Sequence, residues 1–351
     1  MKKDTLMQTV LLTGGSGFFG EVLKQRLLAD GFRCVNIDLQ PDHAQHPNLI
    51  SVQGDIRDVE LMDRLYREHR FEAVFHCAAM LAHAIKDKNE LWTSNVDGTR
   101  RVGEFAKKYH VPRVIFISTN CLWAEEFPHP ITEEEPPRPI EDYGRSKAEA
   151  ERILLDFRDA FHAVIIRTPT IIDAGRLGLL GILFQFIHEG RKVWVVGKGS
   201  NRYQFVYAPD LADACVRSLN HNGSDIFNVG SDNVKTLREV YEYVIAQGGT
   251  GARVASLPER STLLAMKILH LLKLSPLGPY HYRMISKSFA FDTSKIKEKL
   301  GWQPTLTNEQ ILHKAYLYYH QNHADIVRRD DVSAHKRSAK MGLINLLRWL
   351  S

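Results

Sequence analysis

The chain has 351 residues, of which 44% are hydrophobic and 25% are charged. These proportions are typical of a globular protein with a real core, and they exclude intrinsic disorder as the main state. No apolar run reaches the roughly 18 residues that would predict a membrane-spanning helix, and we expect no signal peptide at the N-terminus. At about 150 residues per domain, the length predicts two domains or one α/β unit with an appended lobe.

The net charge of +5 is unevenly distributed, because residues 328–351 contain six basic and two acidic side chains. The rest of the chain is therefore nearly neutral, which argues against a general nucleic-acid-binding surface. The four cysteines are widely spaced and form no CxxC pair, so we expect neither a disulfide framework nor a metal site, and we expect a reducing cytoplasm. They are Cys34, Cys77, Cys121 and Cys215.

Short apolar runs alternate with amphipathic stretches along the first half of the chain. Strands are predicted at 9–12, 34–37, 49–52, 73–76, 114–117 and 163–166, and helices at 18–30, 60–69, 95–109 and 143–158. Continuously apolar strands that alternate with helices predict a parallel sheet covered on both faces. This alternation breaks down over residues 170–204. A strand at 205–207, a helix at 210–219 and a strand at 226–229 predict a return to the sheet, and the remainder is mostly helical.

We therefore predict an α/β protein with a Rossmann-type doubly wound parallel sheet. Residues 1–169 would form the dinucleotide-binding domain, and residues 205–230 would return to it. Residues 170–204 and 231–327 would form a smaller substrate-binding lobe. Residues 328–351 would form a basic amphipathic tail.

A glycine-rich turn follows the first strand and opens the first helix. Gly14, Gly17 and Gly20 are spaced as G-x-x-G-x-x-G. In such a motif the first glycine allows a tight turn, the second lets the backbone approach a pyrophosphate, and the third lets helix and strand pack closely. The free N–H groups at the helix N-terminus favour the phosphates, so the position of the motif predicts a dinucleotide site.

Asp38 ends the second strand and is the residue expected to determine whether NAD or NADP binds. A carboxylate at this position hydrogen-bonds the adenosine ribose hydroxyls and repels a 2′-phosphate. The residues that follow it, Leu39 to Asp42, include no Lys or Arg, which favours NAD over NADP. Asp55 comes after the third strand and could either lie near the adenine or cap the next helix.

Tyr143 and Lys147 are four residues apart and share one face of a predicted helix. A free tyrosine has a pKa near 10, and a neighbouring ammonium group lowers that pKa by favouring the phenolate. The hydroxyls of Ser118 and Thr119 end a strand about 25 residues earlier, where ligands bind in parallel sheets. The combination predicts an acid/base site beside the dinucleotide.

With these motifs, the chain resembles the extended short-chain dehydrogenase/reductase superfamily, in its NAD-dependent epimerase/dehydratase group. The likeness covers about residues 8–320. It is carried by residues 13–20, 76–79, 95–99, 118–119, 167–169 and 300–304, together with Asp38, Tyr143 and Lys147.

The resemblance implies a role for each matching residue. Tyr143 would be the acid/base, Lys147 would hold the nicotinamide ribose and lower the Tyr143 pKa, and Thr119 would hydrogen-bond the reacting oxygen. Asn120 and Arg202 would join Thr119 in binding substrate. The NAD contacts are expected from Gly14, Ser16, Gly17, Phe18, Phe19, Gly20, Asp38, Asp55, Ile56, Ala78, Ala79, Asn95, Ser118, Tyr143, Lys147 and Pro169.

Two departures from the family pattern narrow the reaction. Similar sugar-nucleotide dehydratases have Asp and Glu directly after the catalytic Thr, whereas this chain has Asn120 and Cys121, which disfavours dehydration. Many nucleotide-sugar epimerases have an Arg-Asp-Phe run that meets a substrate phosphate. Arg202 is displaced by one position from that pattern, so the sequence does not decide whether the substrate carries a diphosphate.

The leading hypothesis is therefore a sugar 4-epimerase or a related epimerase, acting on a nucleotide- or lipid-linked sugar. Hydride would pass transiently to NAD, and Tyr143 would exchange the proton. The alternative is net oxidation or reduction of a lipid- or steroid-like hydroxyl, as in the 3β-hydroxysteroid dehydrogenase branch. A non-enzymatic NAD-sensing module is disfavoured by the intact Thr119, Tyr143 and Lys147.

Two segments also suggest contact with a membrane or a lipid-bearing substrate. Residues 262–274 have an apolar face and a basic strip, and the tail combines Lys336, Arg337 and Lys340 with an apolar run that contains Trp349. This composition is typical of interfacial helices. The other interpretation is that both segments pack on the lobe or in a dimer interface. We expect a cytoplasmic homodimer with a small-molecule substrate, and peripheral membrane contact is a hypothesis.

Overall fold

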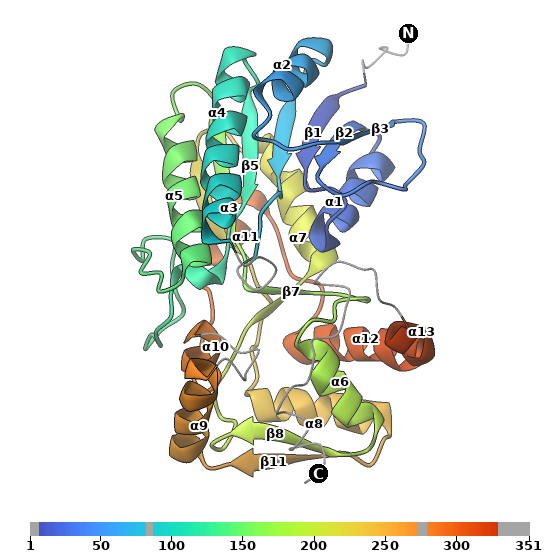
Figure 1. Cartoon of the computed structure of the whole chain (residues 1–351), viewed down its shortest axis with the longest axis vertical. Helices are drawn as coiled ribbons and strands as arrows, with labels where there is room; N and C mark the ends of the chain where they lie inside the picture. Colours follow the sequence, from blue (N-terminus) through green and yellow to red (C-terminus); the bar gives the residue numbers. More distant parts are fainter. Residues whose placement is uncertain (1–6, 82–86, 273–278, 329–351) are drawn as a thin grey trace.

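The computed structural model describes residues 7–81, 87–272 and 279–328. A layered sheet-and-helix part forms the upper half of the molecule and a smaller lobe the lower half (Figure 1). The sheet has seven strands in the order β10-β6-β5-β4-β1-β2-β3, and all its pairings are parallel. The predicted doubly wound sheet is thus confirmed. Its strands are β1 (Thr9–Thr13), β2 (Arg33–Asp38), β3 (Leu49–Gln53), β4 (Ala73–His76), β5 (Arg113–Ile117), β6 (His162–Arg167) and β10 (Asp225–Asn228).

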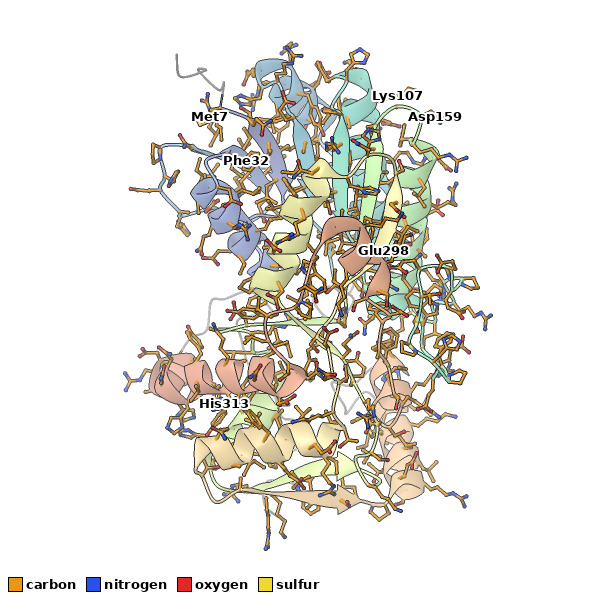
Figure 2. The ribbon with its side chains drawn as sticks, turned by 180° about the vertical axis from the view of Figure 1, so that it is seen from behind. Met7, Phe32, Lys107, Asp159, Glu298 and His313 are labelled. Carbon is orange, nitrogen blue, oxygen red and sulfur yellow. The ribbon has the colours of Figure 1, made fainter. Side chains whose placement is uncertain are left out.

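Helices cover both faces of the sheet, because its strands are apolar on both sides. In β1, Val10 and Leu12 point into one apolar cluster and Leu11 into the other. The first cluster is covered by α1, α7 and α11, and the second by α2, α4 and α5. Figure 2 shows the side opposite to Figure 1, with Glu298 of α11 over the sheet and His313 in the lobe. The helices are α1 (Phe18–Ala29), α2 (Val59–Glu68), α4 (Gly98–Lys108), α5 (Asp142–Asp156), α7 (Ala208–Arg217) and α11 (Ser294–Leu300).

The helix predicted at 95–109 begins earlier and is interrupted. Helix α3 (Lys88–Trp92) leads into one π-helical turn (Thr93–Asp97), and α4 follows directly. The Thr99 hydroxyl donates a hydrogen bond of 2.6 Å to the carbonyl of Asn95 within this turn. Single π turns inside α-helices are frequent at functional sites, and this turn contains Asn95, one of the predicted cofactor residues.

The lobe contains two strand pairs and a set of packed helices. The strand predicted at 205–207 forms as β9 (Phe205–Tyr207), but it pairs with β7 (Thr170–Ile172) and not with the main sheet. The cause is that β6 ends at Arg167 and Pro169 follows, so the chain leaves the sheet before β7 begins. The sequence interpretation also missed β11 (Arg253–Leu257), which pairs with β8 (Lys192–Val196). The helices of the lobe core are α6 (Leu180–His188), α8 (Leu237–Gly248), α12 (Asn308–Gln321) and the shorter α13 (His323–Arg328).

A smaller cluster joins the lobe to the loop after β5. Helix α10 (Pro279–Met284) contributes Tyr280 and Met284, which pack against Leu122 and Trp123. Helix α9 (Glu259–Leu271) packs next to α10. No helix within the described residues is both long and apolar enough to cross a bilayer. The tail at 329–351, and residues 273–274 of the predicted amphipathic segment, lie outside the described residues.

Candidate functional site

The predicted cofactor residues lie along the carboxyl edge of the sheet. From the centre, β1, β2 and β3 succeed one another toward one edge and β4, β5 and β6 toward the other, so the order reverses between β1 and β4. Ligands of open α/β sheets bind beyond the strand ends at such a switch point. The glycine-rich loop after β1 and the segment after β4 meet here, and a Cβ atom on Gly14 would lie only 2.7 Å from the backbone nitrogen of Ala78.

The glycine-rich loop has the geometry of a phosphate cradle. Gly14 has a φ of 78°, a left-handed conformation that favours glycine. A Cβ on Gly20 would lie 2.0 Å from the carbonyl oxygen of Gly14, so a side chain there would push α1 off the loop. Gly17 precedes the first turn of α1, and no side chain caps that helix end. The backbone N–H groups at the start of α1 are therefore available to an anionic group.

Asp38 lies at the end of β2, beside this loop. Its carboxylate accepts hydrogen bonds from the backbone N–H groups of Ser16 and Gln40, each at 2.9 Å. A carboxylate has about four acceptor positions, so both oxygens can still accept bonds from ribose hydroxyls. The residue is thus placed as its predicted role requires, within contact distance of the dinucleotide loop.

A buried ion pair supports the segment after Asp38, and the sequence interpretation missed it. The ammonium of Lys24, on α1, lies 2.7 Å from both carboxylate oxygens of Asp42. Both side chains are almost fully buried, and Asn36 and Ser51 also donate to Asp42. Burial alone would raise the pKa of Asp42, but these hydrogen bonds outweigh it and lower that pKa. The charge of Lys24 is therefore balanced within the protein.

Asp55 does not cap the helix that follows it, so the position near the adenine is the alternative that stays a prediction. The cap of α2 is Asp58, whose side chain accepts the N–H of Leu61. The Asp55 carboxylate accepts the backbone N–H and the guanidinium of Arg57. Burial would raise the pKa of Asp55, but Arg57 outweighs that effect and lowers it. Ile56 is buried against Gly98 of α4.

A chain of hydrogen bonds through His76 links the glycine-rich loop to the helix layer. Burial, and then the charge of Lys147, lowers the pKa of His76 to about 3, so the ring is neutral. The Ala78 N–H donates to the Thr13 hydroxyl, and Nδ1 of His76 lies 2.7 Å from the same oxygen. Nε2 lies 2.9 Å from the Thr99 hydroxyl, which already donates elsewhere. Because Thr99 must accept here, the proton of the ring lies on Nε2.

Asn95 connects the segment after β4 to the helix that carries the predicted acid/base. Its side-chain amide pairs with the backbone of Met80, accepting the N–H at 2.7 Å and donating to the carbonyl at 3.0 Å. It also donates to the Ser146 hydroxyl at 3.0 Å, and Ser146 donates to the Tyr143 carbonyl. The interaction holds Ala78 and its neighbours against α5. Within this segment Ala78 is half-buried and Ala79 is exposed.

The side chains of Thr119 and Tyr143 interact beyond the end of β5, and Lys147 contacts the last residues of that strand. Burial, and to a lesser extent the neighbouring Cys121, raises the pKa of the Tyr143 hydroxyl, against a hydrogen bond from Thr119 and the charge of Arg176. Lys147 is 3% exposed, donates to the Ile117 carbonyl at 2.6 Å and lies 3.8 Å from the Phe116 ring centroid. Burial lowers the pKa of Lys147 to about 7. The effect of Lys147 on the Tyr143 pKa stays a prediction.

Ser118 shows that this end of the cleft suits a polar ligand. It is 3% exposed, and its hydroxyl has no hydrogen-bond partner in the described part of the protein. An unpaired buried hydroxyl is costly unless a ligand satisfies it. With the glycine cradle and Asp38, the residues present fit a dinucleotide that runs from β2 across β1 to β5. Pro169 follows β6 beside them, and Asn120 hydrogen-bonds the carbonyl of the preceding Thr168.

Two tyrosines from the lobe contact the side chain of Asn120. The Asn120 amide donates to the Tyr203 hydroxyl at 2.8 Å and to the Tyr280 hydroxyl at 3.0 Å. The two hydroxyls are 3.2 Å apart. The sequence interpretation missed both tyrosines, since they lie 83 and 160 residues away from Asn120 and belong to no motif.

The predicted substrate residue Arg202 lies outside this cluster. Its guanidinium donates to the Val234 carbonyl near the start of α8, on an exposed part of the lobe. A different arginine enters the cleft: the Arg176 guanidinium lies 5.5 Å from the ring centroid of Phe18, at the first residue of α1. Burial lowers the pKa of Arg176 to about 10. No sequence motif marked Arg176.

The segment at 167–169, which had only been a family landmark, has a structural role. Arg167 is buried and forms an ion pair of 2.8 Å with Glu151, one turn after Lys147 on α5. Its guanidinium also lies 5.2 Å from the Trp123 ring centroid. These contacts fix α5 against the end of β6. Within the described residues no cluster of His, Cys, Asp and Glu side chains could hold a metal ion.

Comparisons with known proteins agree with this arrangement. The model of the NAD dependent epimerase/dehydratase family matches residues 10–230. An uncharacterised protein of Sinorhizobium fredii, y4nG, is 36% identical over 97% of this chain and 86% of its own length. The UDP-glucose 4-epimerase of Mycolicibacterium smegmatis is 27% identical over 88% of this chain and 97% of that enzyme.

Solved structures with the same fold include the UDP-glucose 4-epimerase of Thermotoga maritima in complex with UDP-glucose. It superposes with a TM-score of 0.74 at 23% identity, over 90% of this chain and 99% of that one. The family match covers more than half of the chain and contains every predicted cofactor residue. This chain therefore belongs to the NAD-dependent epimerase/dehydratase family of enzymes, and its cofactor is NAD.

Proposed function

We propose that this protein is an NAD-dependent epimerase of a nucleotide-linked sugar, with UDP-hexoses as the substrate class. The observation that carries the proposal is the interaction of Thr119 with Tyr143 at the end of β5, where Lys147 donates to the Ile117 carbonyl, with a neutral amide directly after Thr119. An acid that could expel water is missing from that position. Relatives named as UDP-glucose 4-epimerases match this chain over nearly their whole length.

The roles of the chain's own residues follow from their positions. The Thr119 hydroxyl would hydrogen-bond the reacting sugar oxygen, and the Tyr143 oxygen would accept the proton of that hydroxyl and later return it. Lys147 would hold the nicotinamide ribose. Asn120, Tyr203 and Tyr280 would bound the space in which the keto sugar turns over. Bound NAD supplies the transfer of hydride from the sugar carbon and back to it.

The removal of the phenol oxygen tests the proposal. UDP-glucose is incubated with the protein, and the formation of UDP-galactose is followed by NMR, with other UDP-hexoses tested in parallel. Replacement of Tyr143 by Phe should lower turnover by at least about 100-fold, because general acid–base catalysis typically contributes that much. NAD affinity, measured by calorimetry, should change by less than about threefold.

A matched control uses Tyr109, which directly follows α4 and whose hydroxyl donates to Asp63 of α2. The Tyr109→Phe variant should keep full turnover. Accumulation of free NADH without any epimer would contradict the proposal and favour net oxidation, the alternative considered from sequence. Turnover by Tyr143→Phe within tenfold of the original protein would show that another group is the acid/base.

A further inference from the structure

Helix α9 exposes a stripe of apolar side chains to the solvent. None of its residues is buried. The exposed fractions are 60% for Leu264, 46% for Ile268, 72% for Leu271 and 61% for Leu272, which directly follows the helix. Their spacing of four, three and one residues places them on a single stripe. The inner side of the helix is apolar as well, with Leu263, Met266 and Leu269 half-buried, so the exposed stripe is a second apolar face.

The charges on the same face all have one sign. At about 100° per residue, Arg260 and Lys267 lie about 40° and 60° from Leu264, on the same edge of the stripe. The one acidic residue of α9, Glu259, lies about 140° away, toward the opposite face. Neither Arg260 nor Lys267 has a hydrogen bond or ion pair with another described residue. The exposed face of α9 is therefore apolar and cationic, without a carboxylate.

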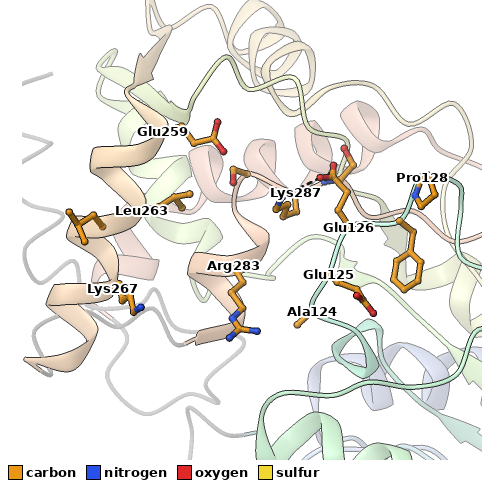
Figure 3. Close-up of a pocket in the computed structure, with 13 residues that line it drawn as sticks. Ala124, Glu125, Glu126, Pro128, Glu259, Leu263, Lys267, Arg283 and Lys287 are labelled. Atoms are coloured by element: carbon orange, nitrogen blue, oxygen red, sulfur yellow. Dashed lines mark hydrogen bonds and ion pairs between the residues drawn. The ribbon is translucent and has the colours of Figure 1, made fainter.

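A groove of about 1120 Å³ runs beside α9. Figure 3 shows Lys267 and Glu259 of α9 and Arg283 of α10 at this groove. Two of its three acidic side chains are paired on the opposite wall, Glu126 with Lys287 at 3.4 Å and Glu125 with Arg138 at 3.2 Å. The third, Glu259, has no ion-pair partner among the described residues, and the same holds for Lys267 and Arg283. The groove therefore carries unpaired charges of both signs, and the purely cationic character belongs to the exposed stripe of α9.

These features select one kind of occupant for the face. A second copy packed through the same stripe would bring two cationic edges into one interface without a carboxylate to offset them, since a twofold interface pairs a surface with itself. The chain's own residues 329–351 are net positive as well. An anionic lipid surface instead offers hydrocarbon to the leucines and phosphates to the cations. At 13 residues, α9 is too short to span a bilayer and suits an orientation along its surface.

We propose that the exposed face of α9 docks the protein on an anionic phospholipid bilayer. Leu264, Ile268, Leu271 and Leu272 would enter the boundary between headgroups and acyl chains, and Arg260 and Lys267 would lie among the phosphates. The neighbouring α10 places Tyr280 on Asn120. The docking face therefore adjoins the helix that closes the proposed sugar site, and it is separate from the catalytic residues.

Co-sedimentation of the full chain with two kinds of vesicle tests the docking. One is pure phosphatidylcholine, and the other contains about one part phosphatidylglycerol to three parts phosphatidylcholine. Binding to the anionic vesicles should be at least about tenfold stronger, since each basic residue near such a surface contributes several-fold. Leu264→Gln with Leu271→Gln should weaken binding at least about tenfold. Arg260→Gln with Lys267→Gln should remove the preference for phosphatidylglycerol.

Val59→Gln is the matched control, because Val59 is 47% exposed on α2, far from this face in the sequence and similar in exposure to Ile268. Its binding should equal that of the original protein. NAD affinity verifies that every variant is folded. The docking does not depend on the sugar reaction, so failure of the epimerase assay leaves this result unaffected.

Three results would overturn the proposal. The first is that the full chain does not pellet with anionic vesicles at low salt. The second is that light scattering without vesicles finds a dimer that the Leu264→Gln and Leu271→Gln changes dissociate, which would make α9 a self-association surface. The third is that a chain ending at Arg328 loses binding while the α9 variants keep it, which would assign the contact to residues 329–351.

Discussion

Replacement of Lys147 by Met should make the stability of the cofactor-free protein much less dependent on pH between 7 and 9. Burial lowers the pKa of Lys147 from 10.5 to about 7 in the folded protein. The unfolded chain therefore binds more protons at this position between about pH 7 and pH 10.5. Stability must rise with pH in that window, since the free energy of unfolding increases wherever the unfolded state binds more protons.

The magnitude follows from the size of the shift. One pKa unit corresponds to about 1.4 kcal/mol, so a shift of about three and a half units costs folding about 5 kcal/mol at low pH. Roughly 4 kcal/mol of that cost remains at pH 7, where about half of the folded protein has lost this proton. The same relation leaves roughly 2 kcal/mol at pH 9, where the unfolded lysine begins to lose its proton. The difference in unfolding free energy between the original protein and Lys147→Met should thus change by about 2 kcal/mol from pH 7 to pH 9. Loss of the hydrogen bond from Lys147 to the Ile117 carbonyl changes the difference in unfolding free energy by the same amount at pH 7 and at pH 9. It therefore does not contribute to the change between the two pH values.

Urea unfolding of both proteins, freed of NAD, at several pH values measures this difference. Other groups that titrate in the range, the buried cysteines among them, are present in both proteins and contribute equally. A difference that stays constant within about 0.5 kcal/mol would refute the reasoning, because it would mean that the Lys147 pKa is ordinary in the folded state.

Two further predictions concern the adenosine end of the site. Asp38→Asn should reduce the preference for NADH over NADPH by at least about tenfold, because it removes the charge that repels a 2′-phosphate. Calorimetry with both cofactors measures the two affinities. An unchanged ratio of these affinities would mean that other residues select the cofactor. Asp42→Asn should lower the free energy of unfolding by about 3–5 kcal/mol, because Lys24 would be left buried without its partner. The double variant Lys24→Met with Asp42→Asn should recover much of that loss in urea unfolding, whereas equal losses would show that the pair is not the cause.

Local patterns in the sequence determined where the first six strands lie along the chain, the dinucleotide loop and the placing of Tyr143 and Lys147 on one helix. These features depend on backbone conformation and on side-chain spacing over a few residues. Gly14 needs its left-handed φ whatever surrounds it, and four residues always bring two side chains to one face of a helix. The continuous apolar runs likewise required cover on both faces of the sheet.

Contacts between distant segments were decided only by the tertiary structure. Asn120 meets Tyr203 and Tyr280 across 83 and 160 residues, and Lys24 finds Asp42 from another element. Strand β9 has an ordinary strand sequence, and only the break at Pro169 makes β7 its neighbour. Periodicity shows that one side of α9 is apolar, but it carries no information on whether another part of the protein covers that side. Burial is a property of the packed whole, and for this reason the outward stripe of α9 became visible only in three dimensions.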